Sequence, residues 1–386
     1  MDPRSYQSTL FGAARRTRGR HGYVAYFPAP IPRTVDLPPS TVALLADAEA
    51  ALGRLAGIGS LLPNPHLLSR PYILREAVSS TRIEGTQASM ADVFELEAGG
   101  GRPDADLEEV LGYADALAWG LGQTELPLST RLIRELHARL MAGVRGRDRM
   151  PGELRTSQNW IGAPGSTIET AAFVPPPPEM VPDLLADWES FAHDDGEMPL
   201  LVRNALLHYQ LETIHPFLDG NGRIGRLLIV FLLVARERLP APLLDISSYF
   251  ERHRDAYYSA LRAVSAEGDA TGWIETFLHA VRVQAGEAVR RAAVLVELRE
   301  RYRRRASALA SHNAIALADL ACESPVLTAR LVTERLDVTR PTAGSLLRRL
   351  EAEGLLTRGG TGERGQQRFV AQEVLDALAG PLAARP

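Results

Sequence analysis

The spacing of apolar residues constrains the fold of this chain more than any other feature. Along most of the sequence they recur three or four residues apart, as in residues 128–143, LSTRLIRELHARLMAG. This period places apolar side chains on one face of a helix. The alternation that marks half-buried strands is rare. The pattern predicts an all-α protein, and 386 residues are enough for two or three domains with a sizeable core.

Composition excludes several classes of function. The net charge of −4 gives no global attraction to nucleic acid or to a membrane. The chain has no lysine, which we attribute to codon bias, so the Walker phosphate loop and the protein-kinase lysine are excluded. Cys322 is the single cysteine, which rules out an intrachain disulfide or a cysteine metal cluster.

No segment of the sequence resembles a membrane anchor. The longest apolar run, residues 227–235, is too short to span a bilayer. The arginines near the N-terminus are not followed by the apolar stretch of a signal peptide. We therefore expect a cytoplasmic protein with no membrane partner.

Shifts in composition predict the domain organisation. Residues 26–32, YFPAPIP, indicate an extended arm, and two helices follow it, one over residues 41–56 and one that ends near Ile83. A further helix begins with Ser129 or Thr130 as its cap. The predicted units are an N-terminal arm and helices (1–106), a mainly helical domain (107–285), an arginine-rich connecting helix (286–306) and a small C-terminal domain (307–386).

The segment TIHPFLDGNGRIGR, residues 213–226, carries the chemistry. Gly220-Asn221-Gly222 leaves two positions without a side chain directly before an apolar helical pattern. Free N–H groups at such a helix start bind anions. Arg223 and Arg226 are three residues apart and share one face of that helix. A pyrophosphate group fits this combination of amides and guanidinium groups.

Two further residues of the segment add possible catalytic groups. Asp219 is either a plain N-terminal cap or a ligand for Mg²⁺ that bridges phosphates. A neutral imidazole at His215 could accept the proton of an attacking hydroxyl. The segment predicts a nucleophile that is activated by His215 and attacks a metal-bound phosphate anhydride.

These residues resemble the signature of the Fic (filamentation induced by cAMP) family, H-P-F-x-[DE]-G-N-G-R-x-x-R, at every fixed position. The resemblance implies an all-α fold and a protein adenylyltransferase, which moves AMP from Mg-ATP to a Ser, Thr or Tyr hydroxyl of a protein and releases pyrophosphate. It implies His215 as general base and Asp219 as Mg²⁺ ligand. Nucleotide binding falls to Gly220, Asn221, Gly222, Arg223, Ile224, Gly225 and Arg226, with Arg226 on the γ-phosphate.

The resemblance also interprets two segments outside the signature. Residues 152–178, rich in Gly, Ser, Thr and Pro, predict an exposed β-hairpin or loop and match the family's flap, with Ile161 against the target and the nucleotide. Tyr257 and Tyr258 match a position that lines the adenine pocket, although a half-buried helix face explains them as well. Ser265 stands where relatives often have Asn, which leaves the adenine contact there open.

An inhibitory motif precedes the signature. Ser80 and Glu84 lie four residues apart near a helix end, and Gly85 follows. A solvated Glu before a glycine cap would explain the pattern by itself. The resemblance implies instead the motif [ST]-x-x-x-E-[GN], whose glutamate pairs with Arg226 and denies the γ-phosphate its anchor. The chain then resembles the self-inhibited class, and Glu84 could also serve removal of AMP.

The C-terminal region resembles a winged helix–turn–helix. A turn is predicted near residues 337–339, a second helix would carry Arg340, Thr342, Ser345, Arg348 and Arg349, and a wing would carry Arg358, Arg364 and Arg368. DNA binding and a protein-interaction or dimer module remain equal alternatives.

Three readings of the whole chain follow from these features. The chain is an autoinhibited adenylyltransferase that modifies a protein hydroxyl, including its own, or a DNA-binding regulator with a nucleotide-sensing Fic domain. A third reading keeps the enzyme but transfers UMP, phosphocholine or phosphate. The intact Gly220-Asn221-Gly222 favours AMP.

Overall fold

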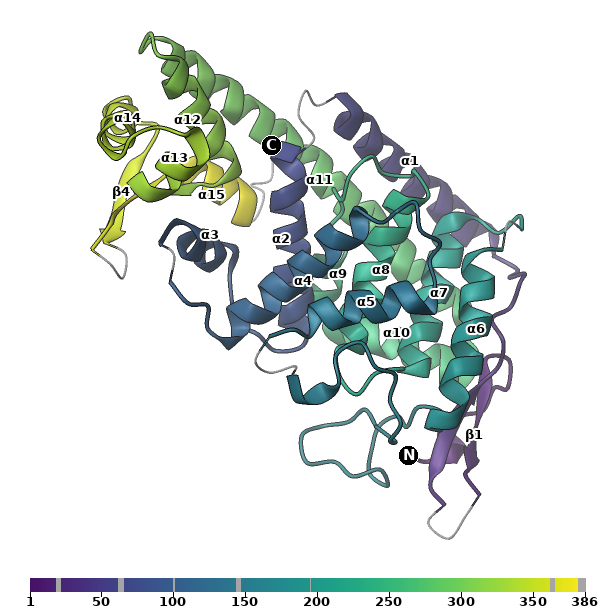
Figure 1. The fold of residues 1–386 in the computed structure, drawn as a ribbon. Helices are drawn as coiled ribbons and strands as arrows, with labels where there is room; N and C mark the ends of the chain where they lie inside the picture. Colours follow the sequence, from purple (N-terminus) through teal and green to yellow (C-terminus); the bar gives the residue numbers. More distant parts are fainter. Residues whose placement is uncertain are drawn as a thin grey trace.

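The computed structural model describes residues 1–18, 22–61, 66–99, 101–143, 147–194, 196–361 and 365–380. Helices dominate it, and the two small sheets lie far apart, one beside α6 and one in the C-terminal unit (Figure 1). The all-α expectation is therefore confirmed for the body of the molecule. Within the described residues, no helix is long and apolar enough to cross a membrane.

Two helices form the centre. Nearly every residue of α7 (Leu200–Ile214) is buried, and α8 (Asn221–Ala235) packs beside it. A helix that is buried on all sides lies inside the core, and both helices flank the segment 215–220. The surrounding helices are α1 Pro39–Leu61, α2 His66–Ile83, α3 Met90–Gly99, α4 Ala105–Leu121, α5 Thr130–Leu140, α6 Val181–Ala192, α9 Ser247–Arg252, α10 Arg254–Glu267 and α11 Ala270–Ser307, with short turns η1 Pro3–Ser5, η2 Arg147–Arg149 and η3 Pro178–Met180.

Several predicted element ends are confirmed. α2 ends at Ile83, and the Ser129 side chain accepts from the N–H of Leu132 at 3.3 Å as the cap of α5. The predicted arm begins as strand β2 (Val24–Pro28), which pairs antiparallel with β1 (Gly12–Arg16). Caps and breakers act within a few residues, so the sequence locates them.

One expectation is corrected. The flap segment forms one antiparallel bridge between Ile161 and Phe173 rather than a hairpin of strands, because proline supplies no N–H and glycine weakens a strand. The connecting helix predicted for 286–306 is confirmed as helical and forms the second half of α11, which is continuous across the expected boundary at 285. Buried residues on one face, from Ala280 to Leu298, extend through that boundary and give no reason for a break.

The C-terminal unit consists of α12 His312–Glu323, β3 Val326–Leu327, α13 Ala329–Leu336, α14 Arg340–Ala352, β4 Thr357–Thr361, β5 Gln367–Val370 and α15 Gln372–Ala379. The predicted turn between α13 and α14 is present and contains Asp337 with φ of 50°, and the structure shows in addition that Thr339 caps α14. The strands form one antiparallel sheet in the order β3-β5-β4.

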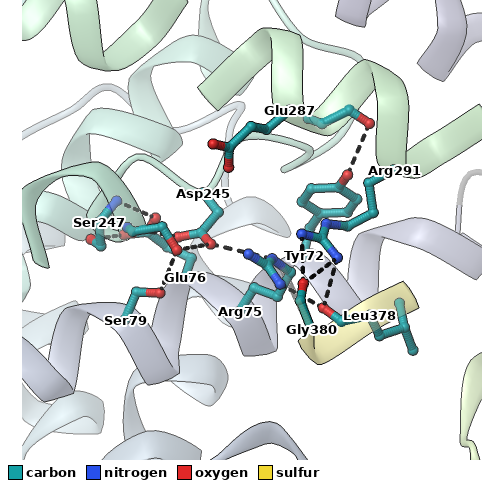
Figure 2. A network of polar contacts seen from close by, with 12 residues as sticks. Tyr72, Arg75, Glu76, Ser79, Asp245, Ser247, Glu287, Arg291, Leu378 and Gly380 are labelled. Atoms are coloured by element: carbon teal, nitrogen blue, oxygen red, sulfur yellow. Dashed lines mark hydrogen bonds and ion pairs between the residues drawn. The ribbon is translucent and has the colours of Figure 1, made fainter. Parts of the chain in front are cut away.

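This unit packs against α2, α3 and α11. Arg75 of α2 donates to the carbonyl of Leu378 at 2.5 Å, and Arg291 of α11 donates to the carbonyls of Ala377, Leu378 and Gly380 (Figure 2). Cations favour the carboxyl end of a helix, where carbonyls lack partners. The end of α15 is thereby attached to the helix that carries Ser80.

The middle of α2 contains a buried acid. Glu76 accepts from Tyr113 Oη at 3.0 Å, from Ser247 N at 3.1 Å and from Ser247 Oγ, and Asp245 lies near it (Figure 2). Burial, followed by the charge of Asp245, raises the pKa of Glu76 to about 8. This carboxyl is therefore protonated at neutral pH.

We predict that Glu76→Gln changes how stability depends on pH. The folded state holds the Glu76 proton up to about pH 8, whereas an unfolded glutamate releases it near its ordinary pKa of 4.5. Unfolding free energy therefore falls as the pH rises through this window. Between pH 4.5 and about pH 8, the unfolding free energy of the variant should therefore rise relative to that of wild type by about 1.4 kcal/mol per pH unit, as measured by urea unfolding. Parallel curves would contradict the assignment, and the surface variant Glu49→Gln is the control.

Candidate functional site

The site is built on the loop between α7 and α8. His215 ends α7 in the left-handed conformation, with φ of 50°, and Gly220 precedes α8 with φ of 76°. A non-glycine residue in the left-handed region of φ/ψ space is strained, and it stays there only when surrounding contacts hold it. Arg155 provides that support, because its side chain donates to the carbonyls of His215 at 2.8 Å and Ile214 at 3.2 Å. It also donates to Pro176 at 2.6 Å and so joins the loop to the base of the flap.

The geometry makes His215 suitable as a base. Its Nδ1 faces the carbonyl oxygen of Glu212 at 3.2 Å, so the proton lies on Nδ1 and the lone pair on Nε2. Burial lowers the pKa of His215 to about 4, so the imidazole is neutral at physiological pH.

The start of α8 presents unpaired amides. Asp219 accepts from Gly220 N at 2.6 Å, and the structure shows no partner among the described residues for the N–H groups of Asn221, Gly222 and Arg223. Such a terminus attracts anions. The Asn221 side chain hydrogen-bonds to the loop itself, since it accepts from Phe217 N and donates to Phe217 O, both at 2.9 Å.

The segment Ser80–Gly85 and the signature meet here. Arg226 is 1% exposed; its Nε donates to Ser80 Oγ at 2.9 Å and its Nη2 to Glu84 Oε1 at 2.6 Å. Burial raises the pKa of Glu84, but the charge and hydrogen bond of Arg226 outweigh it, so the net shift is downward. Gly85 ends the turn with φ of 109°. A side chain at Gly222 would come within 2.6 Å of Glu84 Oε1, so that glycine makes room for the pair.

Arg223 lies between two carboxylates. Its Nη1 donates to Glu109 Oε2 of α4 at 2.9 Å, and its Nη2 lies 3.4 Å from Asp219 Oδ1. The side chain of Asp219 is 47% exposed, and that of Glu109 16%. Sequence reasoning missed Glu109, because an acid in a helix 114 residues away gives no local signal.

His137 of α5 is a second residue that the sequence did not reveal. Its ring stacks on Phe217 with centroids 3.7 Å apart, its Nδ1 accepts from Gly152 N at 2.9 Å, and its Nε2 donates to the Asp219 carbonyl at 2.9 Å. Burial lowers the pKa of His137 to about 4. This neutral histidine joins the start of the flap to the loop.

The structure divides the remaining candidates. Ile161 is 38% exposed, and nearby Asn159 donates to the Phe217 carbonyl at 2.8 Å, so the flap is tied to the loop. Tyr258 is 42% exposed, whereas Tyr257 is buried with its hydroxyl 2.8 Å from His208 Nε2. The hydroxyl of Ser265, also buried, lies 2.9 Å from that of Tyr209. Ile224 and Gly225 are buried within α8, where a side chain at Gly225 would come within 2.7 Å of Glu212 Oε1.

The residues at this site could supply only a small share of the ligands of a metal ion. Within the described parts of the chain, no group of three or more His, Cys, Asp or Glu side chains could hold a metal ion. Asp219 offers one accessible carboxylate. Mg²⁺ commonly uses one or two carboxylates together with substrate phosphates and water, so Asp219 suffices for that arrangement.

Comparisons with known proteins agree with this geometry. Family models for the Fic/DOC family N-terminal region and for the Fic/DOC family match residues 42–122 and 127–233. Protein adenylyltransferase Fic of Drosophila willistoni is 31% identical over 58% of this chain and 43% of its own length. Protein adenylyltransferase fic-1 of Caenorhabditis briggsae is 27% identical over 54% and 41%. The chain thus spans about two fifths of these curated relatives.

Solved structures share the fold. A Fic family protein from Desulfovibrio desulfuricans G20 has a TM-score of 0.56 at 23% identity, over 89% of this chain and 98% of that one. Worm Fic-1, residues 134–508, has a TM-score of 0.51 at 22% identity, over 67% of this chain and 74% of that one. The two family matches and the geometry of the loop agree in likening residues 42–122 and 127–233 of this chain to the Fic/DOC family.

Proposed function

We propose that this protein is an adenylyltransferase that moves AMP from Mg-ATP to a Ser, Thr or Tyr hydroxyl of a protein. The observation that carries the proposal is the juxtaposition of unpaired amides at the start of α8 with a neutral imidazole at His215. The names of the matched relatives support the same activity. No further support comes from solved structures at this identity, which speak only for the fold.

The proposed reaction needs few protein groups. His215 Nε2 accepts the proton of the target hydroxyl while the hydroxyl oxygen attacks the α-phosphorus of ATP. The anhydride bond to the β-phosphate breaks, and pyrophosphate leaves. The amides of α8 and Arg223 stabilise the phosphate charge, and Arg226 holds the γ-phosphate in line. When bound on Asp219, Mg²⁺ would neutralise part of that charge.

We further propose that the Arg226–Glu84 pair is autoinhibitory. One guanidinium cannot serve a γ-phosphate at full strength while it is bonded to Ser80 and Glu84. Glu84 is 36% exposed and stands at a helix end, so displacing it costs less than displacing a fully buried acid. The same carboxylate could activate water for removal of AMP.

His215→Ala should abolish self-labelling with α-labelled ATP, because the other neutral histidine at the loop, His137, has both ring nitrogens engaged, by Gly152 N and by the Asp219 carbonyl. If His215 is the base, its pKa of about 4 also predicts a flat rate between about pH 7 and pH 5.5. A histidine with the ordinary pKa of 6.5 would lose rate over that range. Labelling that persists in the alanine variant, or a rate that halves near pH 6.5, would contradict the role.

Glu84→Gly should raise self-labelling by about ten- to a hundredfold, since a charge-assisted hydrogen bond contributes roughly 1.5–3 kcal/mol. The matched control is Glu49→Gly, which removes the acid of another Arg–Glu pair, Arg238–Glu49, outside the site. Equal labelling of wild type and the Glu84 variant would exclude the inhibitory role and leave the enzymatic proposal standing.

A second candidate function concerns the C-terminal unit, which we propose to be a winged helix–turn–helix that binds DNA. Arg340 and Arg348 are exposed on α14 and make no ion pair within the described residues. The wing is less favourable for phosphate contacts than α14 is. Arg358 pairs with Glu351 at 2.7 Å and Arg368 with Glu95 at 2.5 Å, while Arg364 lies outside the described residues. Phosphate contacts would have to displace both carboxylates.

Full-length protein should therefore bind duplex DNA in low salt, with affinity that falls steeply as salt rises. Replacing Arg340 and Arg348 together by Ala should weaken binding by about tenfold or more, because two phosphate or base contacts are lost. Replacing the exposed Arg54 and Arg304 removes equal charge elsewhere and serves as the control. If the protein binds no duplex DNA, or if both double variants lose affinity for DNA equally, the DNA-binding role fails. A protein-interaction module is then the remaining alternative for this unit.

A further inference from the structure

The position of Arg223 is not explained by the signature alone. Its side chain is 6% exposed, and its Nε is buried without a partner among the described residues. Nη1 donates to Glu109 at 2.9 Å, whereas Nη2 has only long contacts, at 3.4 Å to Asp219 and 3.5 Å to Met141 Sδ. One end of the guanidinium is thus firmly bonded and the other is weakly held.

The two acids differ in how firmly they are placed. Glu109 lies on α4, which packs against both α5 and α8, and its side chain is 16% exposed. Asp219 lies on the loop, is 47% exposed and already accepts from Gly220 N. A carboxylate on a packed helix is a fixed point, and one on an exposed loop can turn toward another cation.

We propose that Glu109 is a positioning residue, which fixes the Nη1 end of Arg223 so that Nη2 stays directed at the loop as a ready phosphate donor. This inference rests on the proposed nucleotide function. It differs from the relation of Glu84 to Arg226, because Glu84 occupies the Nη2 atom that a phosphate would need, whereas Glu109 occupies the opposite end of its arginine.

The physical reason lies in the freedom of a long side chain. Arginine loses roughly 2 kcal/mol of rotamer entropy when it is fixed. If Glu109 fixes it in advance, the nucleotide does not have to. Without Glu109, the nearest acid for the buried guanidinium is Asp219. Arg223 would then turn onto Asp219, and the guanidinium and the carboxylate would occupy each other.

The test uses the Glu84→Gly protein as parent, with Glu109→Ala and Glu109→Gln added separately. The alanine variant should raise KM for Mg-ATP up to about thirtyfold, the equivalent of the lost pre-ordering, with a smaller change in kcat. The glutamine variant should stay within about twofold of the parent, because its amide oxygen still accepts from Nη1. Asp115→Ala removes a different acid of α4, paired with Arg139, and is the control.

Two results would overturn the proposal. A lower KM in both variants would show that Glu109 competes with the phosphates, and an unchanged KM in both would show that it serves stability alone. A readout without nucleotide separates this inference from the proposed function. Heteronuclear relaxation of the Arg223 Nε–Hε group, assigned with Arg223→Lys, should show a rigid side chain in the parent and the glutamine variant and a mobile one in the alanine variant.

If the parent binds no Mg-ATP but the relaxation result holds, the proposed function fails and the positioning of Arg223 by Glu109 stands. If the parent binds Mg-ATP and Arg223 is equally rigid in all three proteins, the positioning role fails and the enzymatic proposal stands.

Discussion

The guanidinium of Arg226 is a buried cation, and a buried cation must be paired. At 1% exposure it can keep its charge only while hydrogen-bond acceptors surround it. Ser80 and Glu84 supply them in this structure, and a triphosphate would supply better ones. Whatever occupies the site must satisfy this one group, so in the proposed mechanism inhibition and nucleotide binding are alternative solutions to a single electrostatic requirement.

The position of Glu84 depends in turn on how α2 is held. Glu76 and Ser80 lie four residues apart on one face of this helix, and Glu84 follows four residues later, directly after the helix ends at Ile83. Glu76 bonds to Tyr113 of α4 and to Ser247, the first residue of α9, while Arg75 reaches the end of α15 in the C-terminal unit (Figure 2). The Glu84 carboxylate therefore directly follows a helix that is anchored to three other parts of the molecule.

Local features were largely predictable from the sequence, and contacts between distant segments were not. The end of α2 at Ile83 and the Ser129 cap follow from side chains within one turn of each boundary. The helix over 286–306 was predicted, but its continuity with the helix before it was not, because composition changes along α11 while its buried face does not. The flap was overestimated as a hairpin, and the family resemblance could not show that Tyr257 turns its hydroxyl to His208 inside the core.

The sequence by itself determined the anion-binding segment, because glycines, an amide-rich helix start and two arginines on one face are all fixed within residues 219–226. It also placed Ser80 and Glu84 on one face of a helix. Only the tertiary structure decided which charges meet. Glu84 reaches Arg226 across 142 residues and Glu109 reaches Arg223 across 114. Such pairings depend on how helices pack, and no short-range pattern encodes which of many surface acids that packing will bring to a buried arginine.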